Sequence, residues 1–282
     1  MINTHPALSI LKRVKSQQLT ISGNEKSTTT LKDSLGYIPT SIFDVDWSET
    51  KILKDFVGDV GDTRKGGGKA VNSMVGISIF NPYLCMCLLR AYAPPHADIY
   101  DPFGGGGTRA IISTIMGHKY TGCEIRQEEI DVVQKRAKVL GLDFTLHHKD
   151  ARDFKAHREF NFSLTCPPYY DLEQYQGGSN DLSMLGTYKE FMGGIQSTMN
   201  NVYESLKPGS FSIWVIGNFR DKKSNLIDFH GNVITVANRA GFDFHDDIVF
   251  HSAPGSAVQR AGVFTANKRA TKIHEYIVIF KK

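Results

Sequence analysis

A run of four glycines behind an apolar segment constrains the fold of this chain more than any other feature. Residues 97–101 (Ala-Asp-Ile-Tyr-Asp) have the character of a buried strand, and an apolar-periodic helical segment begins just after Gly104 to Gly107. Glycines permit positive φ and let a ligand approach bare backbone N–H groups. Such a turn at the C-terminal end of a parallel strand is typical of sites for nucleotide-sized ligands. A tight structural turn without a ligand is the alternative interpretation.

The glycine turn does not match the common phosphate-binding patterns. It lacks the Gly-Lys-Ser/Thr ending of a P-loop, and G-x-G-x-x-G is only partly matched. Asp101, the last residue of the expected strand, is placed to accept hydrogen bonds from a cationic or hydroxylated ligand.

Strand and helix signals alternate through the rest of the chain. The expected strands cover residues 97–101, 119–125, 144–148, 161–165, 211–216, 243–250 and 273–280. The expected helices cover residues 82–92, 109–116, 127–140, 188–206 and 232–240. This alternation predicts a doubly wound, mostly parallel α/β sheet with ligands at its carboxyl edge.

Residues 1–75 are expected to form a short N-terminal arm, and residues 76–282 a single main domain. Residues 1–40 are mostly polar, whereas residues 42–56 carry enough apolar side chains to pack a short element on the main domain. A glycine-rich basic loop at 62–69 contains Arg64, Lys65 and Lys69. It is either a solvated linker or a loop that contacts phosphates.

Composition limits the class of protein and its partners. The net charge of +4 and the pI near 8.7 permit a polyanionic partner without requiring one. The four cysteines form no C-x-x-C pair, which favours a reducing, cytoplasmic setting. No apolar run reaches the roughly 18 residues of a membrane span. We therefore expect a cytoplasmic chain with no membrane partner and no metal site.

Two motifs together resemble those of a known family. Asp-Pro-Phe-Gly-Gly-Gly-Gly-Thr at 101–108 and Thr-Cys-Pro-Pro-Tyr-Tyr at 165–170 are similar to the signatures of S-adenosylmethionine-dependent DNA amino-methyltransferases, roughly D-P-F-x-G-x-G-T and (D/N/S)-P-P-(Y/F/W). The resemblance runs from about residue 78 to the C-terminus and is strongest to small enzymes of phages and mobile elements. It implies a class I, Rossmann-like sheet of seven strands with the last one antiparallel, S-adenosyl-L-methionine as cofactor, and DNA as partner.

The cofactor contacts are expected around the first motif. Glu124 follows Asp101 by 23 residues and would accept both ribose hydroxyls, unless it is a solvated surface glutamate. By resemblance, Asp150 contacts the adenine amino group beside the backbone of Ala151, although it could also cap a short turn. Phe80 could instead be a core residue. The full expected set is Ser78, Phe80, Asp101, Pro102, Phe103, Gly104, Gly106, Thr108, Glu124, Ile125, Asp150 and Ala151.

The chemistry is expected at the second motif. The lone pair of a base amino nitrogen is delocalised into the ring, so an enzyme must accept hydrogen bonds from the two amino hydrogens to restore nucleophilicity. By resemblance, the carbonyl of Pro167 accepts one hydrogen and Tyr169 stacks on the flipped base. Pro167 and Pro168 make the turn rigid.

Cys166 departs from the family pattern, which has Asp, Asn or Ser at this position. A thiol is a weak hydrogen-bond acceptor. Cys166 could still accept one amino hydrogen, mark a relative that binds without methylating, act covalently, or be a small buried residue. Its place before two prolines counts against the covalent mechanism. The departure also leaves adenine and cytosine both open as targets.

Contacts to nucleic acid are expected from the basic loops. An insertion at 251–272 carries Arg260, Lys268 and Arg269 with Phe264, and a solvated basic loop is the alternative interpretation. A polar segment at 174–185 is expected to close over the flipped base. The alternatives in function are an RNA base amino-methyltransferase and a non-catalytic nucleic-acid-binding relative that keeps the cofactor fold.

Overall fold

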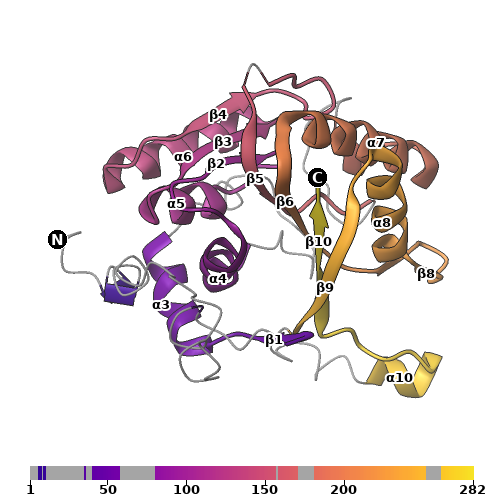
Figure 1. The fold of residues 1–282 in the computed structure, drawn as a ribbon. Coiled ribbons are helices and arrows are strands. Elements are labelled where there is room, and N and C mark those ends of the chain that lie inside the picture. Colours follow the sequence, from indigo (N-terminus) through magenta and orange to yellow (C-terminus); the bar gives the residue numbers. More distant parts are fainter. Residues whose placement is uncertain are drawn as a thin grey trace, which may run out of the picture.

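A central sheet with helices on both faces organises the molecule (Figure 1). The computed structural model describes residues 6, 7, 9, 10, 35, 40–57, 80–156, 158–170, 181–251 and 262–282. In spatial order the strands are β1 (Ile42–Asp44), β9 (Asp243–His251), β10 (His274–Lys281), β6 (Leu206–Ile216), β5 (Phe160–Thr165), β2 (Asp98–Asp101), β3 (Lys119–Glu124) and β4 (Thr145–His148). A separate hairpin pairs β7 (Phe219–Arg220) with β8 (Leu226–Ile227).

The direction of the strands gives the sheet a switch point. Neighbouring strands pair in parallel, except that β10 runs antiparallel to both β6 and β9. The order along the chain reverses between β2 and β5, and open α/β sheets bind ligands beyond the carboxyl ends of the strands at such a point. The predicted doubly wound, Rossmann-like fold is confirmed.

The helices cover the two faces of the sheet. Among the described residues they include α3 (Trp47–Val57), α4 (Pro82–Tyr92), α5 (Thr108–Ile115), α6 (Gln127–Leu140), α7 (Tyr188–Ser205), α8 (Phe229–Ala240), the short α10 (Gly262–Asn267) and the 3-10 turn η4 (Leu182–Met184). Helices α3 to α6 lie on one face, and α7 and α8 lie on the other (Figure 1). Asn81 caps the start of α4 by accepting hydrogen bonds from N–H groups of its first turn, and Gly141 and Gly241 end α6 and α8 in the left-handed conformation.

The core has two layers because successive strand residues point to opposite faces. In β6, Ile213 and Val215 join the cluster under α3 to α6, whereas Trp214 and Ile216 join the cluster under α7 and α8. A strand buried on both faces needs a continuous apolar run, which is why Phe-Ser-Ile-Trp-Val-Ile could be recognised in the sequence.

The sheet has eight strands, where seven were predicted. The additional strand β1 comes from the expected arm and pairs in parallel with β9, with Ile42 opposite Val249. Phe43 is fully buried there, edge-on against Phe250. Three residues are too short to give a strand pattern, so tertiary pairing decides this element. The predicted boundary between arm and domain at 75/76 lies outside the described residues.

Strand β6 also begins earlier than predicted. It starts at Leu206, directly after α7, and passes through Pro208 and Gly209, which the sequence suggested as a break. The register with β5 shifts between Phe160 and Phe162, and Gly209 takes a φ of +80°. A bulge of this kind accommodates proline and glycine within a sheet.

Candidate active site at the carboxyl edge of the sheet

The Asp101 carboxylate lies at the centre of the switch point and is fully buried. Its Oδ1 atom accepts hydrogen bonds from the Phe103 N–H at 3.0 Å and the Thr165 hydroxyl at 2.7 Å. Its Oδ2 atom accepts from Arg109 Nε and from the Tyr120 hydroxyl, both at 2.6 Å. One side chain therefore ties the glycine turn to α5, β3 and β5.

This arrangement differs from the expected contact between Asp101 and a ligand. Four protein donors already occupy its two oxygens, so Asp101 holds the turn from below instead of presenting a free oxygen. Burial by itself lowers the pKa of the Arg109 guanidinium, but the Asp101 carboxylate opposes this and raises it above its ordinary value. Arg109, which sequence reasoning did not single out, therefore remains charged beneath the turn.

The four glycines divide into two packed and two open positions. A Cβ on Gly107, where φ is +76°, would lie 2.5 Å from a Val133 methyl carbon. A Cβ on Gly104 would lie 3.1 Å from the Cys123 carbonyl, to which the Gly104 N–H already donates. By contrast, among the described residues a Cβ on Gly106 would meet only Glu129 Oε1, at 3.5 Å, and one on Gly105, where φ is +50°, only the loop's own backbone. Packing thus requires glycine at 104 and 107, whereas the described residues leave space for a ligand beside Gly105 and Gly106.

Glu124, the last residue of β3, faces this open surface. Its side chain is 10% exposed, which excludes the alternative of a solvated surface glutamate. Its oxygens accept the N–H groups of Gly105 at 3.1 Å and Arg126 at 2.8 Å. Burial raises the pKa of Glu124, while the Arg126 N–H and guanidinium lower it. A carboxylate offers about four lone pairs, so it retains the capacity to accept two hydroxyl groups.

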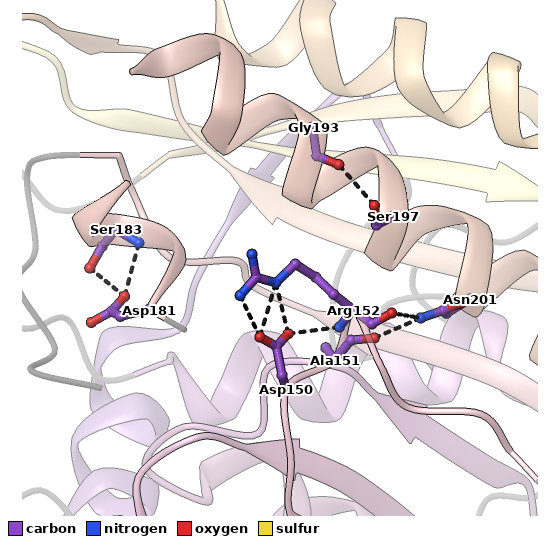
Figure 2. A network of polar contacts seen from close by, with 8 residues as sticks. All are labelled: Asp150, Ala151, Arg152, Asp181, Ser183, Gly193, Ser197 and Asn201. Carbon is purple, nitrogen blue, oxygen red and sulfur yellow. Dashed lines mark hydrogen bonds and ion pairs between the residues drawn. The ribbon is translucent and has the colours of Figure 1, made fainter. Parts of the chain in front are cut away.

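The turn after β4 is built around Asp150 (Figure 2). The Asp150 carboxylate accepts the Arg152 N–H at 2.8 Å and also binds the Arg152 guanidinium at distances from 2.5 to 3.0 Å. Asn201 of α7 donates to the carbonyls of Ala151 at 2.9 Å and Arg152 at 2.7 Å. Asp150 therefore caps the turn, which was the alternative prediction. The Arg152 guanidinium binds the same carboxylate oxygens that were expected to contact adenine. Sequence reasoning missed Asn201, 50 residues away from the turn.

The second motif begins where β5 ends. Thr165 is fully buried and binds Asp101, which places the Cys-Pro-Pro-Tyr segment next to the glycine turn. Cys166 is partly buried against the core cluster under α3 to α6, near the Arg109 guanidinium. The Tyr169 hydroxyl donates to Glu275 Oε1 at 3.1 Å, and the Tyr170 hydroxyl to the Gly186 carbonyl at 3.2 Å.

Several other expected residues lie around the same turn. Phe80 is partly buried, with the Arg109 guanidinium 4.7 Å from its ring centre, so it both packs and borders the site. The Phe103 ring lies edge-on to Trp214, and Thr108 is the buried first residue of α5. The carbonyl of Ile125 lies 3.0 Å from a ring nitrogen of His148.

The predicted nucleic-acid contacts are only partly described. Ser78, Arg64, Lys65, Lys69 and Arg260 lie outside the described residues, as do residues 174–180 of the predicted closing loop. Lys268 is exposed, and its Nζ lies 5.7 Å from the ring centre of Phe264, which is itself 53% exposed. Arg269 is partly exposed. Both residues follow α10, which lies beyond the end of β9 where β10 begins (Figure 1).

One family model matches the C-terminal part of the chain. Residues 160–282 match the family model described as DNA methylase. The match confirms the predicted resemblance to DNA amino-methyltransferases over this part of the chain. No curated protein matches the chain. Within the described ranges, no helix combines the length and apolarity needed to cross a bilayer.

Solved structures with a similar arrangement include several methyltransferases. TrmN from Thermus thermophilus is 16% identical with a TM-score of 0.48, and the match covers 71% of this chain and 48% of TrmN. This chain thus spans about half the length of TrmN. An S-adenosylmethionine-dependent methyltransferase from Methanosarcina mazei is 14% identical with a TM-score of 0.48, covering 69% of this chain and 96% of that one. TehB from Haemophilus influenzae is 10% identical with a TM-score of 0.48, and the match covers 82% of this chain and 67% of TehB.

Proposed function

We propose that this chain transfers a methyl group from S-adenosyl-L-methionine to the exocyclic amino group of adenine or cytosine in DNA, with the base turned out of the duplex. The observation that carries this proposal is the 2.7 Å hydrogen bond between the Thr165 hydroxyl and Asp101. It holds the ends of β5 and β2 together, so that the Cys-Pro-Pro-Tyr segment starts beside the glycine turn. A methyl donor bound at the turn and a base bound at the segment would therefore meet at the switch point.

The residues at the turn fit the cofactor. Gly105 and Gly106 leave room for close approach of a ligand to the backbone, and Glu124 keeps acceptor capacity for two ribose hydroxyls. When bound, S-adenosylmethionine supplies an electrophilic methyl group. The chain contributes the binding surface through Phe80, Pro102, Phe103, Gly104, Gly106, Thr108, Glu124, Ile125 and Ala151. Asp101 acts from beneath as a positioning residue, and Asp150 would contact adenine only after giving up part of its pairing with Arg152.

The second motif would act on the base. The Pro167 carbonyl and the Cys166 side chain accept hydrogen bonds from the two amino hydrogens, which returns electron density to the amino nitrogen. Attack of this nitrogen on the methyl carbon would break the methyl–sulfur bond, S-adenosylhomocysteine would leave, and one amino proton would pass to solvent. Tyr169 presents a ring on which the flipped base stacks. Because sulfur accepts a hydrogen bond less well than oxygen, Cys166 would bind the amino hydrogen more weakly than the Asp, Asn or Ser side chain of the usual motif.

A substitution series at Cys166 tests the reaction. Methyl transfer is measured with radiolabelled cofactor on DNA that lacks methylated amino groups, and the product base is identified by nucleoside mass spectrometry. Cys166→Ser and Cys166→Asp should retain or raise the rate, because an oxygen replaces the sulfur as acceptor. Cys166→Ala should lower it with unchanged cofactor affinity. Loss of activity by orders of magnitude in a folded, cofactor-binding Ser variant, with a trapped protein–DNA adduct, would instead support covalent catalysis.

Parallel assays distinguish the substrate classes. Transfer to structured RNA and not to duplex DNA would support an RNA base methyltransferase instead. Cofactor binding without turnover on either substrate would indicate a non-catalytic relative.

The basic residues after α10 give a separate test for DNA. If Lys268 and Arg269 contact phosphates, replacing each with alanine should reduce the log–log salt slope of DNA binding by about one unit. Lys119 is an exposed control at the opposite edge of the sheet, at the start of β3, and Lys119→Ala should leave the slope unchanged. If all three variants have equal salt slopes, Lys268 and Arg269 do not contact DNA phosphates.

A further inference from the structure

Strand β10 brings a distant part of the chain to the second motif. Because β10 is antiparallel, its first residues lie at the edge where the parallel strands end, and Tyr276 pairs with Ile216, the last residue of β6. Glu275 thereby reaches Tyr169 from 106 positions away in the sequence. No pattern in the sequence indicates this contact.

Three polar side chains and one glycine meet at this place. The Tyr169 hydroxyl donates to Glu275 Oε1 at 3.1 Å, and Lys272 Nζ donates to the Asn218 carbonyl at 2.8 Å. A Cβ on Gly217 would lie 3.1 Å from the Tyr169 hydroxyl oxygen, 3.4 Å from Lys272 Nζ and 3.8 Å from Glu275 Cγ. Tyr169, Lys272 and Glu275 therefore pack closely around Gly217, where the absence of a side chain lets the Tyr169 hydroxyl approach the backbone.

The Tyr169 ring is also fixed from its sides. Phe219 lies edge-on to it, with 6.0 Å between ring centres and 85° between planes. Phe229 lies at 6.3 Å and 61°. Both contacts are of the T-shaped kind that aromatic pairs prefer, so they restrict the plane of the ring, while the hydrogen bond restricts its tip.

We propose that Glu275 is a positioning residue that holds the Tyr169 ring, through its hydroxyl, in the plane on which the target base stacks. This inference rests on the proposed function. Stacking itself needs only an aromatic ring, so the hydroxyl requires another explanation, and its bond to a carboxylate provides one. A charge-assisted hydrogen bond is stronger than a neutral one. Lys272 lies beside Glu275: burial lowers the pKa of Lys272 to about 8, and attraction to the Glu275 carboxylate opposes this shift.

Kinetics with matched variants test the inference. Tyr169→Phe keeps the ring and removes the hydroxyl, and Glu275→Ala removes the acceptor. Each should lower kcat about tenfold, as expected for one charged hydrogen bond, with cofactor affinity unchanged. Glu275→Gln keeps an acceptor oxygen and should recover part of the loss. Glu204→Ala removes a largely exposed carboxylate and should leave kcat unchanged.

The double variant decides how Glu275 acts. If it works through the Tyr169 hydroxyl, Glu275→Ala should have no further effect on kcat in the Tyr169→Phe background. A further tenfold loss there would show that Glu275 acts on the base directly and would overturn the inference.

A spectroscopic measurement separates this inference from the proposed function. In protein labelled with 3-fluorotyrosine, the Tyr169 resonance is assigned by its absence in Tyr169→Phe. It should shift and broaden in Glu275→Ala, and less in the isosteric Glu275→Gln, but not in Glu204→Ala. An unchanged resonance in both Glu275 variants overturns the inference even if the wild type methylates DNA. If the wild type transfers no methyl group to DNA, the proposed function fails while the resonance still reports the contact.

Discussion

Replacing Arg109 with methionine should destabilise the fold, because the change leaves a buried carboxylate without its charge partner. Arg109 is 5% exposed, and Asp101 is fully buried. Their ion pair joins Nε and Oδ2 at 2.6 Å, and the guanidinium also donates to the Phe103 carbonyl. Methionine retains much of the aliphatic stem, so the loss is mainly the charge and its hydrogen bonds.

The magnitude follows from what remains around Asp101. Removing one partner of a buried ion pair typically costs about 3–5 kcal/mol. Thr165, Tyr120 and the Phe103 N–H still donate to the carboxylate, so we expect the lower end of this range, about 3 kcal/mol. Adding Asp101→Asn removes the unpaired charge, and the double variant should therefore be more stable than Arg109→Met alone.

Equilibrium urea unfolding followed by circular dichroism measures these free energies. In a thermal scan, about 3 kcal/mol corresponds to a fall in Tm of roughly 6–12 °C for a chain of this size. Arg158→Met is the matched control, because that side chain is 49% exposed and its ion pair with Asp98 should contribute about 1 kcal/mol or less. The reasoning is refuted if Arg109→Met costs no more than this control, or if the double variant is less stable than the single one.

Three further changes test the site and the fold. Gly106→Ala should fold normally, but calorimetry should show about tenfold weaker binding of S-adenosylhomocysteine, since the alanine methyl group occupies the open face of the turn. An unchanged affinity would show that the ligand does not bind against Gly106. Burial raises the pKa of Glu124, and ribose hydroxyls would favour its charged form. The affinity for S-adenosylhomocysteine should therefore fall as the pH is lowered, and it should not depend on pH in this way in Glu124→Gln. An equally steep pH profile in the variant would exclude this role of Glu124. Burial, with a smaller effect of His96, lowers the pKa of His118 to about 4, and its Nδ1 accepts the Ala97 N–H. The free energy of unfolding should therefore be fully retained above about pH 6.5 and fall by up to about 3 kcal/mol toward pH 4, because the unfolded chain takes up the proton first. In His118→Gln, the free energy of unfolding measured by urea titration should fall less steeply as the pH is lowered. Parallel pH profiles for the wild type and the variant would contradict the assignment of this fall to His118.

Local patterns in the sequence predicted helices α4 to α8 and the fold class, but not α3 or α10. Asn81 followed by Pro82 predicts the start of α4, and Gly141 the end of α6, because caps depend on groups only two to four residues apart. The alternation of strands and helices likewise predicts the parallel sheet, since each unit is set by its own periodicity. The two motifs lie at the carboxyl edge of this sheet for the same reason, since each begins at the last residue of a strand, β2 or β5.

Tertiary structure alone decided what the side chains at that edge contact. The sequence suggested that Asp101 faces a ligand, but the bond from Thr165, 64 positions away, and those from Arg109 and Tyr120 make it a buried anchor. The contact between Tyr169 and Glu275 spans 106 positions. Such pairs depend on strand order, direction and register, which are fixed when the whole core packs. A periodicity read over a few residues carries no information about them.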